Sequence, residues 1–348
     1  MSYQVCEEDL ATARGAALET LAMTRSVDIT PERYDWLYCD NPDGQAVLWS
    51  IRKQATGEMA GFTVALPRRM LVDGRERICW NGADFSIRQQ HRSLGLALKL
   101  RRAAKDGVDA GRVDFLYAHP NAKMQLIHER VGHSPVGTMV RWAKPLRISA
   151  HLQRRLGHNL VTRLGGPVAD TLFKWATPPL WYRPSCQLTV ETDPRFDGRF
   201  DRLFADVGPA RAVVGIRDAR YLHWRYKQNP LYRTHALVAS EGGRLAGYAL
   251  FMVDGESAHL KDLFCRTDGP WQDDLLWGVS EECRRRGLAS LSAVVLNGHP
   301  LERSFGRFGF RRRPETSQMF GYAAQASPVK QTVLSGSSWL LSVGDRDV

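Results

Sequence analysis

Long apolar runs are missing from this 348-residue sequence. No stretch of about 18 uncharged apolar residues occurs, which is the length that a membrane-spanning helix needs. The nearest candidate, residues 160–181, is interrupted by Arg163, Asp170 and Lys174. The first residues are acidic at 7–9 and lack the apolar core of a secretory signal. We therefore expect a cytoplasmic protein without a membrane span.

Cysteine pairs are also missing. No Cys-x-x-Cys motif occurs among the six scattered cysteines, Cys6, Cys39, Cys79, Cys186, Cys265 and Cys283. This spacing argues against a structural zinc site and against a disulfide framework. The sequence predicts no metal centre and a reduced, cytoplasmic setting.

Negative charge is scarce relative to positive charge. The chain carries 48 Lys and Arg against 37 Asp and Glu, a net charge of +11, and such a field favours anionic partners. The candidates are nucleotide phosphates, acidic carrier proteins, nucleic acid and an anionic membrane surface. Nucleic acid is disfavoured, because the basic runs 284–286 and 311–313 lack the interleaved aromatic residues of a base-stacking surface.

The sequence contains an internal repeat. Three segments recur in the same order: 36–42 (Trp-x-Tyr-x-x-Asn-Pro) at 224–230, 57–62 at 243–248, and 130–133 at 307–310. The chain length suits two domains of ordinary size, and the repeat period is far too long for a solenoid. The sequence therefore predicts two tandem copies of one unit.

Each copy shows the same succession of strand and helix patterns. Apolar and alternating segments predict strands at 46–52, 60–66, 77–87 and 113–118 in the first copy and at 235–240, 246–253, 257–264 and 290–296 in the second. Helical patterns cover 95–110 and 272–286, each between the third and fourth of these strands. This order predicts an α/β (α+β) fold.

These patterns divide the chain into four parts. The first copy covers 1–143, the second covers 185–325, and 326–348 forms a tail. Residues 144–184 are rich in Arg and His with leucines at near-helical spacing. They predict a basic amphipathic helix that packs across the two domains or, alternatively, docks on a membrane surface. We expect the tail to be loosely held, although 339–341 could add a strand.

One strand-to-helix loop in the first copy carries the pattern Arg92-x-x-Gly95-x-Ala97. Backbone N–H groups at a helix N-terminus point outward and bind a pyrophosphate. Small residues at Gly95 and Ala97 let the backbone come close to such a group. The basic side chains of Arg88, His91 and Arg92 can add charge-assisted hydrogen bonds.

This loop resembles the acyl-CoA loop of the GNAT family of N-acyltransferases, which reads Gln/Arg-x-x-Gly-x-Gly/Ala. The resemblance covers residues 3–142 and 187–322 and implies two tandem domains. Each would have a mixed, mostly antiparallel central sheet flanked by helices. It also implies an acyl-CoA co-substrate, with acetyl-CoA as the first candidate. The cofactor-binding residues that it implies in the loop are Phe85, Ile87, Arg92, Ser93, Leu94, Gly95, Leu96 and Ala97.

A second motif similar to that family follows at residues 121–133. Asn121 matches the family asparagine that bonds the pantetheine arm. The family tyrosine that protonates the departing thiolate is replaced by His128, which can act as a general acid or be a plain helix-face histidine. The spacing from His128 to His133 is one residue too long for the zinc-binding His-Glu-x-x-His pair.

The resemblance also implies a base that takes the proton of the attacking amine. Asp84 is the carboxylate on the strand before the loop, and partial burial would raise its pKa as a base requires. The other interpretation of Asp84 is a surface or hydrogen-bonded carboxylate. We expect Asn81 to orient the substrate, and we also assign Trp36 and Tyr38 to substrate binding.

The second copy lacks the loop. Its counterpart, residues 266–274, contains three acidic residues and Pro270. The charge has the wrong sign for a pyrophosphate, and the proline removes one N–H donor. We expect no CoA there and infer that the second copy shapes the substrate cleft or stabilises the pair.

The leading hypothesis is an acyl-CoA-dependent N-acyltransferase in which an amine attacks the thioester directly. The acceptor is a small-molecule or carrier-bound amine that the sequence does not identify. Two other donors fit the positive charge: an aminoacyl-tRNA, against which the intact loop argues, and an acyl carrier protein. A different class of function also stays open, namely a non-catalytic CoA-binding or scaffold protein. The oligomeric state is open as well.

Overall fold

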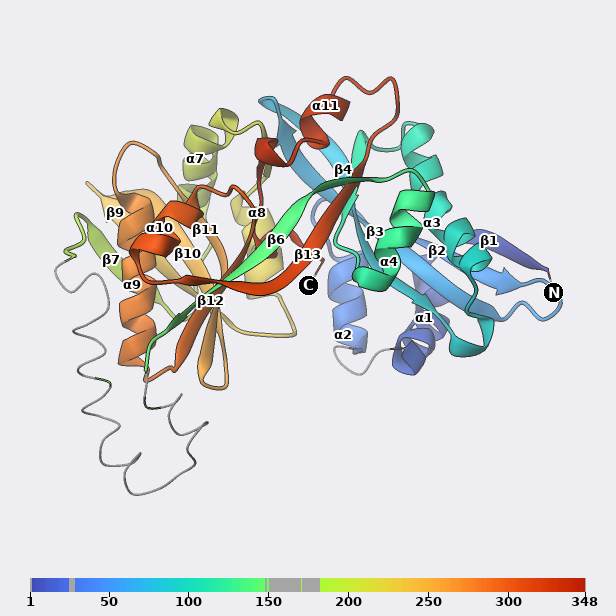
Figure 1. Ribbon diagram of the computed structural model, residues 1–348, viewed down its shortest axis with the longest axis horizontal. Coiled ribbons are helices and arrows are strands. Elements are labelled where there is room, and N and C mark those ends of the chain that lie inside the picture. The colour runs from blue at the N-terminus through green and yellow to red at the C-terminus, as the bar shows by residue number, and fades with distance from the viewer. Residues whose placement is uncertain (1, 25–28, 148, 150–169, 171–181, 348) are drawn as a thin grey trace.

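The computed structural model describes residues 2–24, 29–147, 149, 170 and 182–347. Most of the predicted linker helix, 144–184, lies outside the described residues. The described residues form two halves that lie side by side along the longest axis of the molecule (Figure 1).

The first half begins with a strand, a long helix and a short helix that continues into a π-helical turn. Its elements are β1 (Tyr3–Glu8), α1 (Leu10–Thr24), α2 (Pro31–Tyr34), the π-helical turn Asp35–Cys39, β2 (Val47–Lys53), β3 (Met59–Val72), β4 (Arg75–Ile87), α3 (Leu94–Asp109), β5 (Phe115–Ala118), α4 (Ala122–Arg130) and β6 (Ser134–Pro145). Every strand and helix predicted for the first copy is present, and β3 continues beyond its predicted end to Val72.

The second half repeats this order and adds elements from the tail. They are β7 (Gln187–Glu191), α7 (Gly198–Val207), β8 (Val213–Gly215), α8 (Ala219–Leu222), the π-helical turn His223–Lys227, β9 (Thr234–Glu241), β10 (Arg244–Asp254), β11 (Ser257–Cys265), α9 (Trp271–Arg285), β12 (Ser290–Leu296), α10 (Leu301–Arg307), β13 (Arg311–Tyr322), α11 (Lys330–Val333) and β14 (Trp339–Leu340). The strands and helix predicted for the second copy are present. The mixed, mostly antiparallel sheet flanked by helices is confirmed.

The two halves exchange their last long strands within one continuous sheet. The strand order is β1-β2-β3-β4-β5-β13-β6-β12-β11-β10-β9-β7. Strand β13 of the second half pairs with β5, and Phe320 lies opposite Ala118. Strand β6 of the first half pairs with β12, and Val140 lies opposite Val295. The two exchanged strands cross between the halves in Figure 1, so neither half completes its sheet alone.

The repeated Trp-x-Tyr motif forms a near-symmetric contact between the halves. The indole Nε1–H of Trp36 donates to the carbonyl of Trp224 at 2.9 Å, and the indole of Trp224 donates to the carbonyl of Trp36 at 2.9 Å. The rings are stacked with centroids 5.2 Å apart. Each indole therefore satisfies its N–H in a buried contact, and the internal repeat becomes a pseudo-two-fold relation in space.

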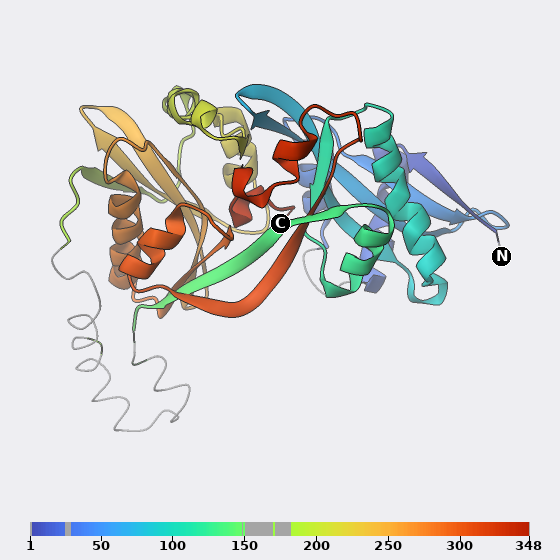
Figure 2. The same ribbon diagram turned by 45° about the horizontal axis from the view of Figure 1, so that its top comes forward.

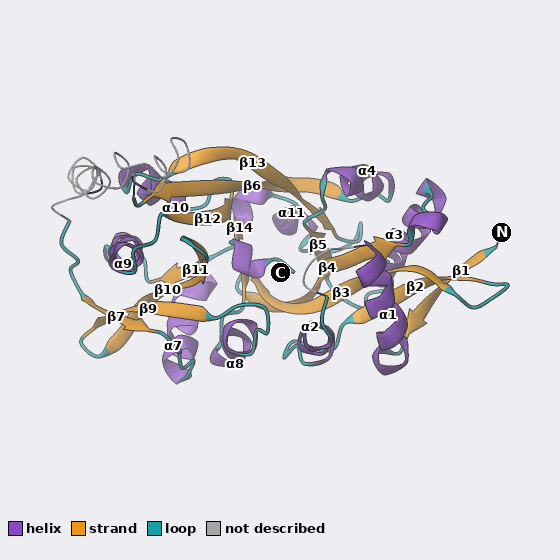
Figure 3. Ribbon diagram, turned by 90° about the horizontal axis from the view of Figure 1, so that it is seen from below, coloured by secondary structure: helices purple, strands orange, loops and turns teal. Residues whose placement is uncertain are grey.

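Helices cover both faces of the first half. The buried strand residues alternate between two cores, as the pleat requires. Leu48 and Val64 pack with α1 and the Trp36 turn, whereas Trp49 and Ala65 pack with α3. Figure 3 shows α1 and α2 of this half in one row with α7 and α8 of the other.

The tail is held firmly between the halves, contrary to the expectation of a loose segment. Strand β14 pairs in parallel with β8, and β8 pairs with the end of β3, so the predicted strand at 339–341 is confirmed. The buried guanidinium of Arg225 donates to the carbonyls of Gly344, Arg346 and Asp347 at 3.2, 2.9 and 3.1 Å. The chain end consequently lies near the centre of the molecule (Figure 2). In the described part of the chain, no helix is both long and apolar enough to cross a membrane.

Candidate active site

Strands β4 and β5 pair only over part of their length and then diverge. Their parallel pairing runs from Cys79 opposite Phe115 to Gly82 opposite Ala118. Beyond that point β4 continues to Ile87, whereas β5 ends at Ala118 and the chain turns into α4. The backbone groups of β4 past Gly82 that face β5 therefore lose their strand partner, which leaves an opening at this edge.

A β-bulge in β4 marks the point of divergence. The register against β3 shifts there, since Ala83 lies opposite Val64 and Ser86 lies opposite Phe62. Asp84, in the bulge, has a left-handed backbone with φ of 39°, which is unusual for a residue other than glycine. The bulge turns the last residues of β4 toward the opening.

A groove of about 700 Å³ lies along this opening. It is lined by residues from the end of β4, the start of α3 and the start of α4, namely Thr24, Phe85, Ser86, Ile87, Arg92, Ser93, Leu94, Ala97, Asn121, Lys123, Met124 and Ile127. Seven of the predicted cofactor-binding residues are among them: Phe85, Ile87, Arg92, Ser93, Leu94, Ala97 and Asn121. Leu96 instead faces the core, and a Cβ at Gly95 would meet open space.

The N-terminus of α3 opens onto the groove. Ser93 is the N-cap, and its Oγ accepts a hydrogen bond from Leu96 N at 3.3 Å. The other amides of the first turn lack partners from a preceding turn and carry the positive end of the helix dipole. Leu94 is 44% exposed beside them.

Two of the three predicted cations do not reach the groove. Arg88 is buried, and it donates to Glu19 at 2.9 Å and to Thr20 at 3.1 Å. His91 bonds the hydroxyl of Tyr3 at 3.0 Å.

The cations that line the groove are Arg92, as predicted, and Lys123, which the sequence analysis missed. Lys123 lies between the matched Asn121 and the helical run of α4, so a count of positive charges around the second motif could have found it.

A smaller pocket of about 110 Å³ lies at the inner end of the opening. It is lined by Gly82, Ala83, Asp84, Phe85, Arg101, Ala118, His119, Pro120, Asn121, Met124, His128 and Asp347. Phe85, Asn121 and Met124 line both this pocket and the groove. The structure thus brings the predicted base, Asp84, and the predicted acid, His128, to one cavity next to the groove.

Asp84 is a buried carboxylate in an ion pair. Arg33 donates to it through two nitrogens at 2.8 and 3.1 Å, and the Tyr38 hydroxyl donates at 2.5 Å. Burial and the neighbouring carboxylate raise the pKa of Tyr38 well above its usual value, so the phenol stays protonated. Arg33 supplies the positive counter-charge that a buried carboxylate requires. The hydroxyl of Tyr38 is thus bonded to Asp84, and its predicted contact with substrate stays a prediction.

His128 is buried, and its Nδ1 lies 2.9 Å from Nδ1 of His133. One of these two nitrogens must carry a proton and donate a hydrogen bond, and the other must accept that hydrogen bond. Burial, together with the charge of Arg101, lowers the pKa of His128 far below its usual range. The imidazole is therefore neutral near pH 7 and can donate only its single N–H. Its role as the acid stays a prediction.

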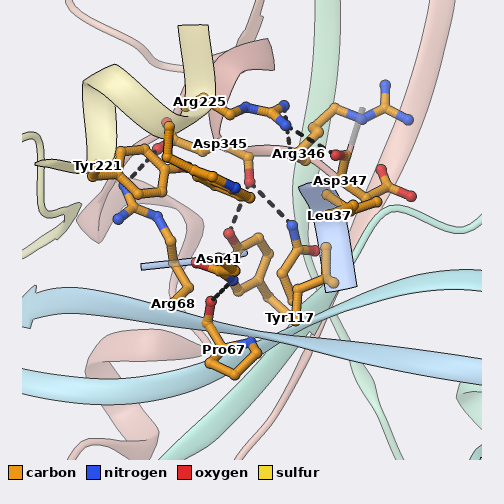
Figure 4. Close-up of a pocket in the computed structure, with 13 residues that line it drawn as sticks. Leu37, Asn41, Pro67, Arg68, Tyr117, Tyr221, Arg225, Asp345, Arg346 and Asp347 are labelled. Carbon is orange, nitrogen blue, oxygen red and sulfur yellow. Dashed lines mark hydrogen bonds and ion pairs between the residues drawn. The ribbon is translucent and has the colours of Figure 1, made fainter. Parts of the chain in front are cut away.

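A third cavity lies between the halves (Figure 4). It measures only about 20 Å³, because residues of the tail occupy the space. Asn81 lines it and donates to the carbonyl of Asp345 at 3.3 Å. Tyr117 donates to the same carbonyl at 2.8 Å. Asn81, predicted to orient substrate, thus holds the tail in this structure, and Trp36 lies in the contact with Trp224.

The corresponding loop of the second half is filled by its own side chains. Trp271 begins α9, and its Nε1 donates to Asp268 at 2.9 Å. Asp274 is fully buried and accepts from Tyr182 and Ser185. The first turn of α9 therefore points the carboxylate of Asp274 inward, where α3 presents open amides.

Known proteins resemble this chain in three-dimensional structure but not detectably in sequence. No protein-family profile matches the sequence, and no curated protein matches it. Among the described residues, no group of three metal-ligating side chains is found.

Three solved structures illustrate the likeness. A probable N-acyltransferase from Enterococcus faecalis V583 is 9% identical with a TM-score of 0.65, over 93% of this chain and 73% of that one. A GCN5-related N-acetyltransferase from Anabaena variabilis is 11% identical with a TM-score of 0.67, over 92% and 73%. Saccharomyces cerevisiae N-myristoyltransferase with bound myristoyl-CoA is 13% identical with a TM-score of 0.58, over 94% and 80%. The chain therefore has the GNAT fold along nearly its whole length.

Proposed function

We propose that this chain is an acyl-CoA-dependent N-acyltransferase whose co-substrate binds in the groove between β4, α3 and α4. One observation carries the proposal. The open N-terminus of α3 lies beside the unpaired end of β4, and both border one groove of about 700 Å³. A long, flexible anionic ligand fits such a groove, because one end needs backbone N–H donors and the rest can pair with a strand edge.

The groove residues divide by chemistry along its length. The first-turn amides of α3, with Arg92 and Lys123, would hold the pyrophosphate through charge-assisted hydrogen bonds. The strand edge at Phe85 and Ile87 would pair with the amides of the pantetheine arm. Asn121, at the mouth of the inner pocket, would contact the arm near the thioester.

The reaction would occur at the inner pocket. The amine nitrogen forms a bond to the thioester carbonyl carbon, the C–S bond breaks, and the amine proton passes to a base while sulfur leaves as the thiol or thiolate. Asp84 and Asp347 are the carboxylates that line this pocket. We propose Asp84, directly or through water, as the base, and His128 as a donor of its one N–H toward the sulfur. Acetyl-CoA is the simplest co-substrate with which to test the proposal.

The test is isothermal titration of acetyl-CoA into the wild type, Gly95→Glu and Gly306→Glu. A Cβ at either glycine meets open space, so both variants should fold, and Gly306 lies in α10 of the other half. We expect micromolar binding to the wild type and to Gly306→Glu, and its loss in Gly95→Glu, which places a carboxylate among the pyrophosphate donors. Absence of binding to the wild type with any acyl-CoA would contradict the proposal.

A second function has its own support. Asp84 is held by Arg33 and Tyr38, and His128 is neutral, which leaves a weak acid and a weak base. A protein that binds CoA without turnover would show the same groove. An amine panel with detection of free thiol separates the two: thiol release above the hydrolysis background supports the transferase, and binding without release supports the non-catalytic protein.

A further inference from the structure

Arg101 is a buried cation at the inner pocket. It lies on α3, one turn inside the helix from the groove-lining residues, and it is 2% exposed. Its Nε and Nη2 atoms are buried without hydrogen-bond partners. No described carboxylate forms an ion pair with it, whereas the neighbouring buried arginine Arg33 has Asp84. A buried guanidinium without a counter-charge is costly, so its presence next to a cavity points to an anion that the cavity receives.

Arg101 remains charged near neutral pH. Burial alone lowers its pKa to about 10, which is still above physiological pH. The neighbouring histidines do not supply a negative charge either. Burial lowers the pKa of His119 to about 3 and that of His133 far below its usual range, so both imidazoles are neutral. Both ring nitrogens of His119 are also buried without partners.

The backbone is shaped around this guanidinium. A Cβ at Gly82 would lie 2.6 Å from Nη2 and 3.0 Å from Nη1 of Arg101, and 3.2 Å from the Cβ of Ala118. Any larger residue at position 82 would therefore push the guanidinium away. Gly82 and Ala118 form the last pair of β4 and β5 before the strands diverge, so the cation sits at the closed end of the opening.

The pocket continues from the groove, with Phe85, Asn121 and Met124 shared between them. A ligand that extends inward along β4 would present its far end to Arg101. The two carboxylates of the pocket act on other arginines: Asp84 pairs with Arg33, and the charge of Asp347 helps to raise the pKa of Arg225. A free carboxylate at the end of the ligand would find in Arg101 a cation without a counter-charge.

We propose that Arg101 binds the distal carboxylate of a short dicarboxylic acyl group, such as malonyl or succinyl, so that the chain selects a carboxylated acyl-CoA over acetyl-CoA. This inference rests on the proposed binding of acyl-CoA in the groove. Charge-assisted, two-pronged hydrogen bonds between guanidinium and carboxylate supply the selectivity. The neutral histidines of the pocket add N–H donors without adding charge.

The experiment is titration of free CoA, acetyl-CoA and succinyl-CoA into the wild type, Arg101→Met and Arg102→Met. Arg102 is the exposed neighbour on the same helix, so its variant removes one positive charge without changing the pocket. We expect succinyl-CoA to bind the wild type and Arg102→Met about 10- to 100-fold more tightly than acetyl-CoA. Arg101→Met should lose this preference while it keeps its affinity for free CoA and acetyl-CoA.

Gly82→Ala gives an independent check, because it keeps the charge but displaces the guanidinium. We expect the same loss of preference for succinyl-CoA in that variant. Equal affinity of the wild type for acetyl-CoA and succinyl-CoA would overturn the inference while leaving the proposed function intact. Absence of binding by all three ligands would instead overturn the proposed function.

Two further outcomes would overturn the inference in a defined way. If Arg101→Met slows transfer from acetyl-CoA and succinyl-CoA by the same factor, the guanidinium acts on the thioester rather than on the acyl end. If Arg101→Met raises KM only for acceptor amines that carry a carboxylate, the anion belongs to the acceptor. A matched pair of amines, an amino acid and its decarboxylated counterpart, distinguishes this source.

Discussion

The buried ion pair between Arg33 and Asp84 gives the sharpest stability prediction. Their side chains are 4% and 0% exposed, and two guanidinium nitrogens reach the carboxylate. The change Asp84→Asn keeps the shape but removes the negative charge, so Arg33 stays buried without compensation. Removing one partner of such a pair costs about 3–5 kcal/mol. Asn tolerates the left-handed backbone of position 84, so backbone strain should add little.

The assay is urea denaturation followed by tryptophan fluorescence. We expect the urea midpoint to fall for Asp84→Asn with the m-value unchanged. Arg33→Met should lower the free energy of unfolding by a similar amount, because it leaves the buried carboxylate without its cation. In the double variant the loss should be smaller than the sum of the two single losses by at least about 1 kcal/mol, since neither charge is then left alone.

A loss below about 1 kcal/mol in Asp84→Asn would refute this reasoning, because it would mean that water reaches the pair. Turnover gives a separate readout. If Asp84 is the base, Asp84→Asn should abolish transfer while acyl-CoA binding persists; unchanged transfer would remove Asp84 from the mechanism.

Three further predictions follow from buried groups. Trp36→Phe should cost about 1–2 kcal/mol in urea denaturation, because it leaves the buried carbonyl of Trp224 without its donor; equal stability would show that water replaces the bond. Burial beside Arg284 lowers the pKa of Lys144 from 10.5 to about 7, so the unfolded chain binds more protons between these values and stability should rise with pH across that window. Lys144→Met should flatten this rise and stabilise the fold at pH 7 by about 4 kcal/mol. Arg225→Met should release the tail, so that limited proteolysis cuts near 344–347 before it cuts elsewhere.

Much of the fold could be predicted from the sequence, because the strands and helices depend on the local spacing of apolar residues. The period-two and helical segments predicted the strands and helices of both copies, and the recurrence of Trp36 at Trp224 predicted a duplicated unit. The loop at 92–97 predicted a helix N-terminus with accessible N–H groups, because its small residues let a ligand approach the backbone. The structure places that N-terminus beside a groove.

The remaining features depend on contacts between segments far apart in the chain. The exchange of β6 and β13 could not be predicted, since an alternating strand does not show which sheet edge it joins. Arg88 looked like a phosphate ligand but pairs with Glu19, on a helix about 70 residues earlier. The tail looked loose because its composition is polar, yet the buried Arg225 holds its carbonyls. The sequence did not single out Arg101, because an arginine in a helix with several other basic residues is expected to be exposed to solvent.

Hydrogen exchange with and without acyl-CoA tests the central claim most directly, because it locates the ligand as well as detecting it. The account predicts that saturating acetyl-CoA or succinyl-CoA slows exchange of the amides at 93–97 and 121–127 in the first half. It predicts no change at 266–274, where the second half fills its own loop. Protection at 266–274, or no protection at the start of α3 under conditions of saturation, would contradict the placement of the co-substrate in the groove.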